Sequence, residues 1–251
     1  MDTELRYRTQ LIMSVTFTLM GPGAFVSSAV QAQLRFTEDF EQDLARWEIV
    51  GPQAIEIRDS GDPTHGRVLV LENDGWDVYA LIRNSDTWGG VRVEGDVLFP
   101  DDQHNYLGVL YNYRRSATRT DFGNIYIKGN GSYLRVNPHR DGNASRILYE
   151  EFRTPLVGSA AITIGEWQHF KAEIIGRVFH FYVGDMSTPQ VTFPLYEGSS
   201  GLIGFQPRSV GAPVWIDNIT VTSIDRMSYG GPDLPRGITT HRTRLLPTGR
   251  S

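Results

Sequence analysis

The chemistry that this sequence could perform depends first on its carboxylates. Glu94 and Asp96 stand two residues apart in "VRVEGDVLF", a spacing that places both side chains on one face of a strand. Two carboxylates on one face can act as acid and base, but a solvent-facing sheet position is the favoured explanation, because Asp and Glu are mostly exposed. Glu150 and Glu151 are adjacent, so on a strand they would point to opposite faces and could not share a substrate.

Other reactive groups are absent from the sequence or lack the required spacing. The chain has no cysteine, which excludes disulfides, thiolate zinc sites and a cysteine nucleophile. Its six histidines show no metal-ligand spacing such as His-Glu-x-x-His. No Gly-x-Ser-x-Gly and no glycine-rich phosphate loop follows a strand. No constellation of residues therefore demands catalysis.

The segments that would position these groups are short strands. They alternate apolar and polar residues, or run apolar at strand length, with Gly, Asn, Asp or Pro between them. Asn130-Gly131 predicts a type I′ hairpin turn, with positive φ at both residues. This pattern predicts an all-β fold, a two-sheet antiparallel jelly-roll sandwich. The predicted strands lie within 67–73, 90–99, 105–114, 124–136, 167–176, 177–185, 201–206 and 214–221.

Charge is unevenly distributed along the chain of 251 residues, which has an acidic central part and a basic C-terminal part. Residues 33–224, the predicted jelly-roll domain, carry 17 lysines and arginines against 25 aspartates and glutamates, a net charge of −8. An acidic domain argues against a nucleic-acid partner, whose phosphates need a basic face. Residues 225–251 carry a net charge of +3 and no apolar period, which predicts a disordered tail or linker. The sequence does not predict the oligomeric state.

Residues 1–32 have the pattern of a secretory signal peptide. Arg6 and Arg8 precede the apolar run "LIMSVTFTLM", and "VQA" provides small residues before a cleavage site after Ala32. The alternative is an N-terminal membrane anchor, but the glycines and proline of 21–23 make the apolar run short for one. We expect a secreted or periplasmic protein with no membrane span in the mature chain.

Three motifs resemble one known superfamily. "GEWQHFKAEIIGRVFHFYVGD" (165–185), "FTEDFEQDLARWEIVG" (36–51) and "GLIGFQPRSVGAPVWIDNITV" (201–221) are similar to signatures of concanavalin A-like (laminin-G-like) jelly rolls. The resemblance spans about 35–222 and implies a jelly-roll fold. It is less specific for function, because the superfamily includes carbohydrate-binding modules, glucanases, lyases and the 3-keto-disaccharide hydrolase domain.

The resemblance also implies a structural calcium ion. In several sugar-binding jelly rolls an acidic residue of the first strand and an Asp of the last strand share it. The matching residues here are Glu41 and Asp217. Calcium takes several oxygen ligands, backbone carbonyls included. The alternative is a hydrogen-bonded Asp217-Asn218 pair that satisfies backbone groups at a strand bulge.

The resemblance does not extend to glucanase catalysis. Endo-glucanases of this fold carry Glu-x-Asp-x-x-Glu on one strand, with the carboxylates on one face. Glu94 and Asp96 match that spacing, but Phe99 stands where the second glutamate is needed. This departure removes the glucanase interpretation.

A carbohydrate-binding face is the better-supported functional prediction. Sugars bind to flat aromatic rings flanked by Asn, Asp, Arg and Gln side chains. By alternation, Leu110, Ile125, Ile127, Leu134 and Val136 point into the core, and Tyr111 and Tyr113 share the solvent-facing, concave face. Tyrosine is also a good strand former, so it could cover the sheet for stability alone. The residues predicted on this face are Tyr111, Tyr113, Tyr126, Lys128, Arg135 and Asn137.

The tryptophans divide between predicted ligand contacts and predicted core. Trp76 and Trp88 lie in loops among Gly and Asp, where a Trp either meets a ligand or packs down onto the sandwich. We predict both as carbohydrate contacts. Trp47 and Trp167 match the family motifs and are predicted to be core residues.

Three hypotheses for function follow. The first is an exported, non-catalytic jelly-roll domain that binds a neutral or acidic oligo- or polysaccharide and holds a structural calcium. The second is a glycoside hydrolase of the 3-keto-disaccharide hydrolase type. The third is a structural or interaction domain of an exported protein.

Export leads to a first testable prediction. If the signal peptide is cleaved after Ala32, N-terminal sequencing of the exported protein should begin at Gln33. An exported protein that still begins at Met1 would contradict cleavage.

Overall fold

The computed structural model describes most of the predicted domain. The described residues are 32–51, 55–72, 78–103, 105–117, 120–141, 146–147, 152–195, 201–209 and 212–224, with only the backbone at 138–141, 146–147, 152 and 209. Three predictions therefore lie outside the described residues: the signal peptide, the C-terminal tail and the loop residue Trp76.

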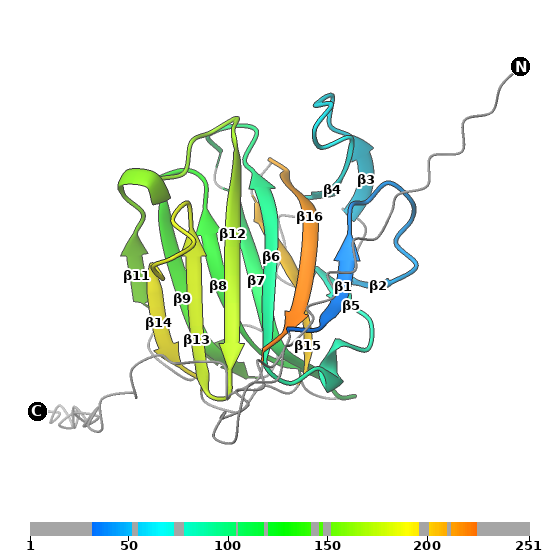
Figure 1. Cartoon of the computed structure of the whole chain (residues 1–251), viewed down its shortest axis with the longest axis vertical. Helices are drawn as coiled ribbons and strands as arrows, with labels where there is room; N and C mark the ends of the chain where they lie inside the picture. The colour runs from blue at the N-terminus through cyan, green and yellow to red at the C-terminus, as the bar shows by residue number, and fades with distance from the viewer. Residues whose placement is uncertain are drawn as a thin grey trace, which may run out of the picture.

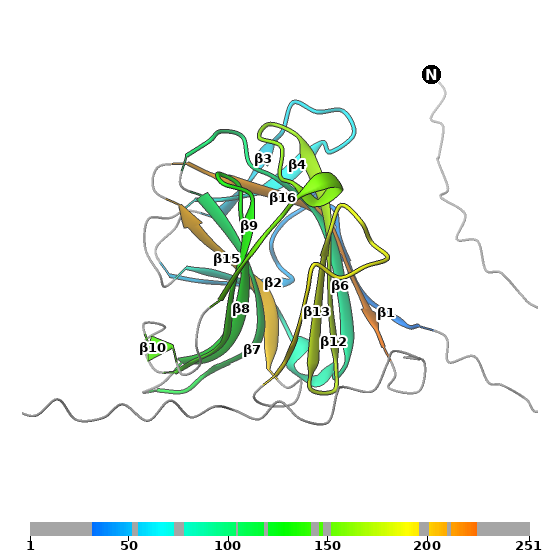
Figure 2. The ribbon, with the colours of Figure 1, turned by 90° about the vertical axis from the view of Figure 1, so that its left-hand side faces the viewer.

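Two antiparallel sheets form the molecule (Figures 1 and 2). Sheet A has the order β14 (Val191–Pro194), β13 (Val178–Val183), β12 (Trp167–Ile175), β6 (Val91–Leu98), β16 (Val214–Ser223), β4 (Arg67–Leu71) and β3 (Ile55–Asp59), and β1 (Leu34–Glu38) pairs with β16. Sheet B has the order β10 (Arg146–Ile147), β9 (Tyr133–Asp141), β8 (Thr120–Lys128), β7 (Asn105–Arg115), β15 (Leu202–Ser209), β5 (Tyr79–Ile82) and β2 (Trp47–Val50), and β11 (Phe152–Pro155) pairs with β9. Two 3₁₀ turns, η1 (Ser85–Thr87) and η2 (Gly158–Ala160), complete the described elements.

The predicted all-β sandwich is thus confirmed. Helix is limited to the two short 3₁₀ turns in the described part of the chain, where we find nothing helical with the length and apolarity to cross a membrane. The predicted hairpin at 124–136 exists as β8 and β9, but its turn differs from the expected type. Positive φ falls on Gly131 and Ser132 rather than on Asn130 and Gly131, so the type I′ assignment is wrong.

The core lies between the sheets and follows strand alternation. On β6, Val91, Val93 and Val97 face inward and are fully buried, as are Ile125 and Ile127 of β8. We use "outer face" for the side of each sheet that points away from this core.

The two predicted core tryptophans differ. Trp47 is 1% exposed and packs edge-on against Phe36, as predicted. Trp167 is only partly buried. It pairs with Leu98 of β6 at the start of β12 and stacks on His65, on the outer face of sheet A. The prediction that Trp167 is a core residue is therefore wrong.

A bulge in β7 overturns part of the predicted alternation. Asn112 has φ 56°, and the register with β8 shifts between Tyr111 and Arg114. Before the bulge, Leu107, Val109 and Tyr111 alternate into the core in unbroken register with β8. The Tyr111 ring centroid lies 4.7 Å from that of Phe179, where Gly123 leaves space for the ring. The bulge then changes the phase of the strand after Tyr111. Tyr113 points to the outer face, so the two tyrosines do not share a face.

Two predictions for residues before the bulge are out of phase with the strand by one residue. Tyr111 belongs to the core, so its prediction as a carbohydrate contact is wrong. Leu110, predicted to be in the core, packs instead with the outer-face cluster of Tyr79, Leu81, Tyr113 and Phe122.

Candidate functional site

Register places the predicted binding residues in neighbouring rows on the outer face of sheet B. One row runs Gln206, Gly108, Tyr126 and Arg135 across β15, β7, β8 and β9. Gly108 has a structural purpose here, because a Cβ at that position would meet the Tyr126 ring. The ring can therefore extend across β7 toward β15.

Hydrogen bonds connect the amides of this face. Tyr126 Oη donates to Gln206 Oε1 at 2.7 Å, and Asn124 Nδ2 donates to the same oxygen at 3.0 Å. Asn137 Nδ2 donates to Asn124 Oδ1 at 2.8 Å. Asn137 Oδ1 is buried and has no hydrogen-bond partner within the described part of the chain. The network is thus fixed in position, and one acceptor remains unused.

A second row brings tyrosines and a lysine together. Tyr106 Oη and Tyr133 Oη lie 2.9 Å apart, and Lys128 Nζ lies 5.4 Å and 5.6 Å from the centroids of the two rings. Burial and the Tyr133 hydrogen bond raise the pKa of Tyr106 to about 12. The Tyr106 hydroxyl therefore keeps its proton at neutral pH.

The structure confirms the predicted facing of four residues but not their exposure. Tyr126, Lys128, Arg135 and Asn137 all lie on the outer face of sheet B. Tyr126 and Asn137 are 0% exposed and Lys128 is 5% exposed, whereas Arg135 is half-buried. The expectation that the whole set faces solvent is wrong. Their carbohydrate contacts stay a prediction.

The remaining predicted aromatic residues lie elsewhere. Trp88 follows η1 and packs against the core, with its ring 6.3 Å from Phe36. Of the two alternatives for a loop tryptophan, packing onto the sandwich is the one observed. Tyr113 packs with Tyr79 and Phe122 in an apolar cluster that adjoins the amide network, since Leu110 of this cluster pairs with Asn124.

A second polar cluster lies on sheet A, at a bulge in the closing strand. Asp217 pairs directly with Asp96 of β6, and the register then shifts before Thr220. Asn218 occupies the bulge with φ 53°, a left-handed conformation that Asn tolerates better than most residues. The bulge explains the two polar residues inside an otherwise apolar strand, as the hydrogen-bonded alternative predicts.

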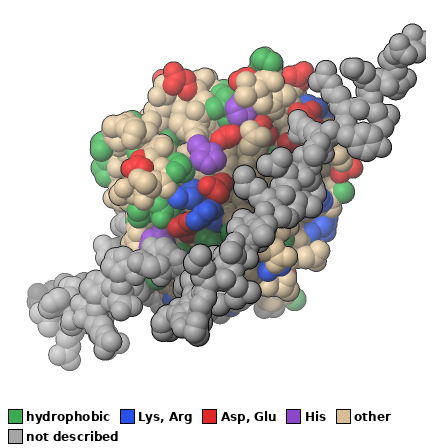
Figure 3. Space-filling view, in the orientation of Figure 1, with side chains coloured by type: hydrophobic (Ala, Val, Ile, Leu, Met, Phe, Trp, Pro, Cys, Tyr) green, Lys and Arg blue, Asp and Glu red, His purple; other side chains and the backbone are tan. Residues whose placement is uncertain are grey.

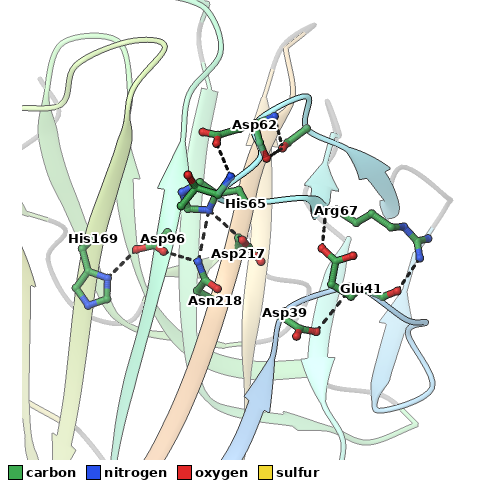
Figure 4. A network of polar contacts seen from close by, with 11 residues as sticks. Asp39, Glu41, Asp62, His65, Arg67, Asp96, His169, Asp217 and Asn218 are labelled. Carbon is green, nitrogen blue, oxygen red and sulfur yellow. Dashed lines mark hydrogen bonds and ion pairs between the residues drawn. The ribbon is translucent and has the colours of Figure 1, made fainter. Parts of the chain in front are cut away.

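Each carboxylate of this pair contacts a histidine (Figure 4). His65 Nδ1 lies 2.9 Å from Asp217 Oδ2, and His169 Nδ1 lies 2.7 Å from Asp96 Oδ1. Asn218 Nδ2 donates to Asp96 Oδ2 at 2.9 Å and so bridges the two pairs. Sequence analysis missed this cluster, because contacts between residues more than 70 positions apart leave no local pattern.

His65 is held by a tight turn and by an aromatic ring. Asp62 Oδ1 accepts the Thr64 N–H at 2.8 Å, and Asp62 O accepts the N–H groups of His65 and Gly66. The His65 ring stacks on Trp167, with centroids 3.9 Å apart. His65 is therefore fixed against Asp217.

The two carboxyl groups have opposite pKa shifts. Burial raises the pKa of Asp217 to about 6, and the Asp96 charge adds to this effect. Burial also acts on Asp96, but hydrogen bonds from His169 and Asn218 outweigh it and lower the pKa of Asp96. The hydrogen bond to Asp96 raises the pKa of His169.

The predicted calcium ligands approach the same turn from two sides. Asp217 contacts His65, and Glu41 Oε1 accepts the Arg67 N–H at 2.8 Å beside Gly66. Asp217 Oδ1 is buried and lacks a hydrogen-bond partner among the described residues, which suits a cation. No group of three or more His, Asp or Glu side chains within the described ranges could hold a metal. Backbone carbonyls and water would have to supply the other ligands.

A cavity of about 530 Å³ adjoins the bulge. Asn218 belongs both to its wall and to the polar cluster. The described carboxylates of this wall mostly stabilise the β1–β2 loop; Glu38, for example, accepts the Trp47 Nε1–H at 3.1 Å. The cavity is lined by Thr37, Glu38, Asp39, Gln42, Asp43, Ala45, Arg46, Asn218, Ile219 and Thr220.

On the rest of the sheet A outer face, charges are paired. Figure 3 shows histidine, acidic and basic side chains gathered near the centre of this side of the molecule. Arg92 Nη2 lies 2.8 Å from Glu173 Oε1, and Tyr182 Oη donates to Glu173 Oε2 at 2.9 Å. These contacts satisfy the charges internally.

Solved structures with a similar fold include a galectin-like protein and two glucan-degrading enzymes, by their names. A galectin-like protein of unknown function from Bacillus subtilis is 10% identical, with TM-score 0.55 over 77% of this chain and 97% of its own. A β-glucanase from Bacillus licheniformis is 13% identical, with TM-score 0.51 over 76% and 98%. The laminarinase from Rhodothermus marinus is 11% identical, with TM-score 0.51 over 77% and 98%.

The chain has the concanavalin A-like jelly-roll fold, as the motifs predicted. No family model and no curated protein matches the sequence. At such low identities the likeness shows the fold alone, so function must be argued from the side chains.

The buried Asp217 generates a prediction about pH. Its pKa is about 6 in the folded protein against 3.8 as the ordinary value, so the folded state binds the proton more tightly. Between pH 4 and 6 this group therefore makes stability fall as pH rises, by up to about 3 kcal/mol. Urea unfolding should show wild type losing stability relative to Asp217→Asn across this window.

For Asp96 we expect the opposite dependence of stability on pH. Its pKa is lowered, so its contribution is present above pH 4 and is lost as pH falls below 4. Wild type should therefore lose stability relative to Asp96→Asn on acidification. A stability difference between wild type and Asp217→Asn that is constant from pH 4 to 6 would contradict the buried-carboxyl account.

Proposed function

We propose that this protein is an exported, non-catalytic carbohydrate-binding domain that holds a glycan on the outer face of sheet B. The observation that carries the proposal is the combination, on one sheet face, of tyrosine rings, a fixed amide network and cationic side chains. The half-buried Tyr133 and Arg135 are within a ligand's reach. Beneath them, Tyr126, Asn124 and Asn137 are bonded in place.

This arrangement suits sugars for a physical reason. A pyranose presents an apolar C–H face that packs on a tyrosine ring and hydroxyl groups that bond to amides and guanidinium groups. Each such hydrogen bond nets only about 1 kcal/mol against water. Binding should therefore be weak, with Kd on the order of micromolar to millimolar. The similar β-glucanase and laminarinase agree with a sugar ligand.

A glycoside hydrolase is the second candidate, and one observation favours it. Asp96 and Asp217 are directly paired carboxyl groups whose pKa values are shifted in opposite directions, as in many acid–base pairs. Asp217, however, is only 1% exposed and contacts His65, so a substrate cannot reach it in this structure. The binding function is therefore preferred.

Export and calcium are further parts of the proposal. The "VQA" pattern supports export, and the unpartnered Asp217 Oδ1 supports a bound cation. If calcium binds, Glu41 and Asp217 would each contribute a carboxylate oxygen. Their place between the β1–β2 loop, β16 and the turn at 62–66 would then make the ion a structural one.

Carbohydrate binding can be tested on a glycan array and by affinity electrophoresis in polysaccharide gels. Wild type should bind at least one glycan, and Tyr133→Ala should weaken binding about tenfold or more, because stacking on the ring is lost. Trp215→Ala is the control: Trp215 is a partly buried aromatic residue on β16 of sheet A, and its loss should leave affinity unchanged.

The same glycans separate the alternatives. Release of reducing ends or 3-keto sugar, abolished by Asp96→Asn, would establish the hydrolase. A folded protein that neither binds nor cleaves any glycan would leave the structural-domain hypothesis.

Calcium is tested by thermal unfolding with and without a chelator. An ion bound only by the folded state stabilises it by mass action, so EGTA should lower Tm and excess CaCl₂ should restore it. Asp217→Ala should remove the EGTA effect, while Lys171→Gln, which changes a charge elsewhere on sheet A, should retain it. A wild-type Tm that does not respond to EGTA refutes the calcium proposal.

A further inference from the structure

Lys128 is a buried cation that has no carboxylate partner among the described residues. Its side chain is 5% exposed, and its ammonium group donates to Asn130 O. None of the ion pairs between described residues includes it. Burying an ammonium group is costly unless an opposite charge compensates it. The rings of Tyr106 and Tyr133, each more than 5 Å away, compensate only in part.

Lys171 on sheet A is a lysine of comparable burial with different cross-strand neighbours. Lys171 is 9% exposed, lies 3.7 Å from the Tyr182 ring centroid and donates to Met186 O. Its direct partner across the sheet is Glu94. The partners of Lys128 across β7 and β9 are Tyr106 and Tyr133 instead. Both lysines are buried near tyrosine rings and donate to a backbone carbonyl, but only Lys171 has a carboxylate-bearing residue as a direct cross-strand neighbour.

Further cations lie near the two tyrosine rings that flank Lys128. Arg153 of β11 is exposed, and its guanidinium carbon lies 5.2 Å from the Tyr133 ring centroid. Register places Arg153 directly opposite Arg135, an arrangement of like charges that destabilises a sheet. Arg208 approaches the Tyr106 ring at 6.0 Å.

Positive charge thus accumulates on two adjacent rows of the sheet B face. These rows hold Lys128, Arg135, Arg153 and Arg208, and no carboxylate is present among their described side chains. Arg135 and Arg208 act to lower the pKa of Tyr106, which shows that their positive potential reaches this position. The domain as a whole is acidic, so this cluster is a local exception.

We propose that Lys128 and Arg153 bind the anionic groups, carboxylate or sulfate, of an acidic polysaccharide on the outer face of sheet B. This inference rests on the proposed carbohydrate-binding function and names its ligand class. An anion seated between the two side chains would supply the opposite charge that Lys128 lacks among the described residues. Tyr133, which lies beside both cations, would contact the sugar ring.

The proposal predicts that this face prefers charged glycans to neutral ones. A neutral glycan would leave the Lys128 ammonium group uncompensated, so it should bind more weakly than a charged glycan of the same backbone. Binding should also weaken with salt, because the anionic chain and the cations both hold counterions. The net negative charge of the domain adds long-range repulsion, which makes local charge contacts decisive.

The test measures affinity of the full chain for dextran, dextran sulfate and polygalacturonate by calorimetry at 50 and 200 mM NaCl. At least one anionic polymer should bind tenfold or more tightly than dextran. Lys128→Gln and Arg153→Gln should each weaken that binding about tenfold, the loss expected for one charge-assisted hydrogen bond. Because Arg153 is exposed, its variant tests the site even if Lys128→Gln fails to fold.

Matched controls are available on sheet A. Lys171→Gln removes a comparably buried lysine that stacks on a tyrosine, and Arg58→Gln removes an exposed arginine. Both should keep wild-type affinity. Preference for dextran sulfate alone would assign sulfate, and preference for polygalacturonate alone would assign carboxylate.

The outcomes distinguish this inference from the proposed function. Binding of neutral glycans without an anionic preference, or anionic binding that Arg153→Gln leaves unchanged, overturns the inference and leaves carbohydrate binding in place. Failure of the wild type to bind any glycan, neutral or anionic, overturns the proposed function and the inference with it.

Discussion

The strands that build the shared core each give one face to it, and this constraint decides which side chains remain for function. Successive residues point to opposite faces, so a strand that buries Ile125 and Ile127 must present Tyr126 and Lys128 on its other side. A bulge is the means by which the chain changes this phase. Asn112 does so in β7, where Tyr113 turns to the outer face, and Asn218 does so in β16, directly after Asp217.

The two outer faces handle their charges differently. On sheet A, carboxylates and cations meet within the protein, as in the Arg92–Glu173 and Asp96–His169 pairs. Burying those charges is tolerable because each has a partner. On sheet B, the Lys128 ammonium group is packed among tyrosines. This contrast, more than the fold, is the reason for proposing the outer face of sheet B as the ligand face.

Much of the fold follows from the sequence, since alternation and turn residues are local signals; the core position of Trp47 and the facing of Tyr126 illustrate this. What could not be predicted is non-local. Nothing in the sequence distinguishes Asn112 from other polar strand residues, so the bulge that turns Tyr113 to the outer face leaves no pattern. The His169–Asp96 contact depends on the register of β12 against β6, which no spacing encodes. Burial of Asn137 likewise depends on packing across strands.

The most direct measurement is a crystal structure of the protein with a sulfated or uronate oligosaccharide. The account predicts the ligand on the outer face of sheet B, with an anionic group within hydrogen-bond distance of Lys128 Nζ or the Arg153 guanidinium and a sugar ring beside Tyr133. An oligosaccharide bound instead in the cavity beside Asn218, or against the Asp96–His169 pair, would contradict it.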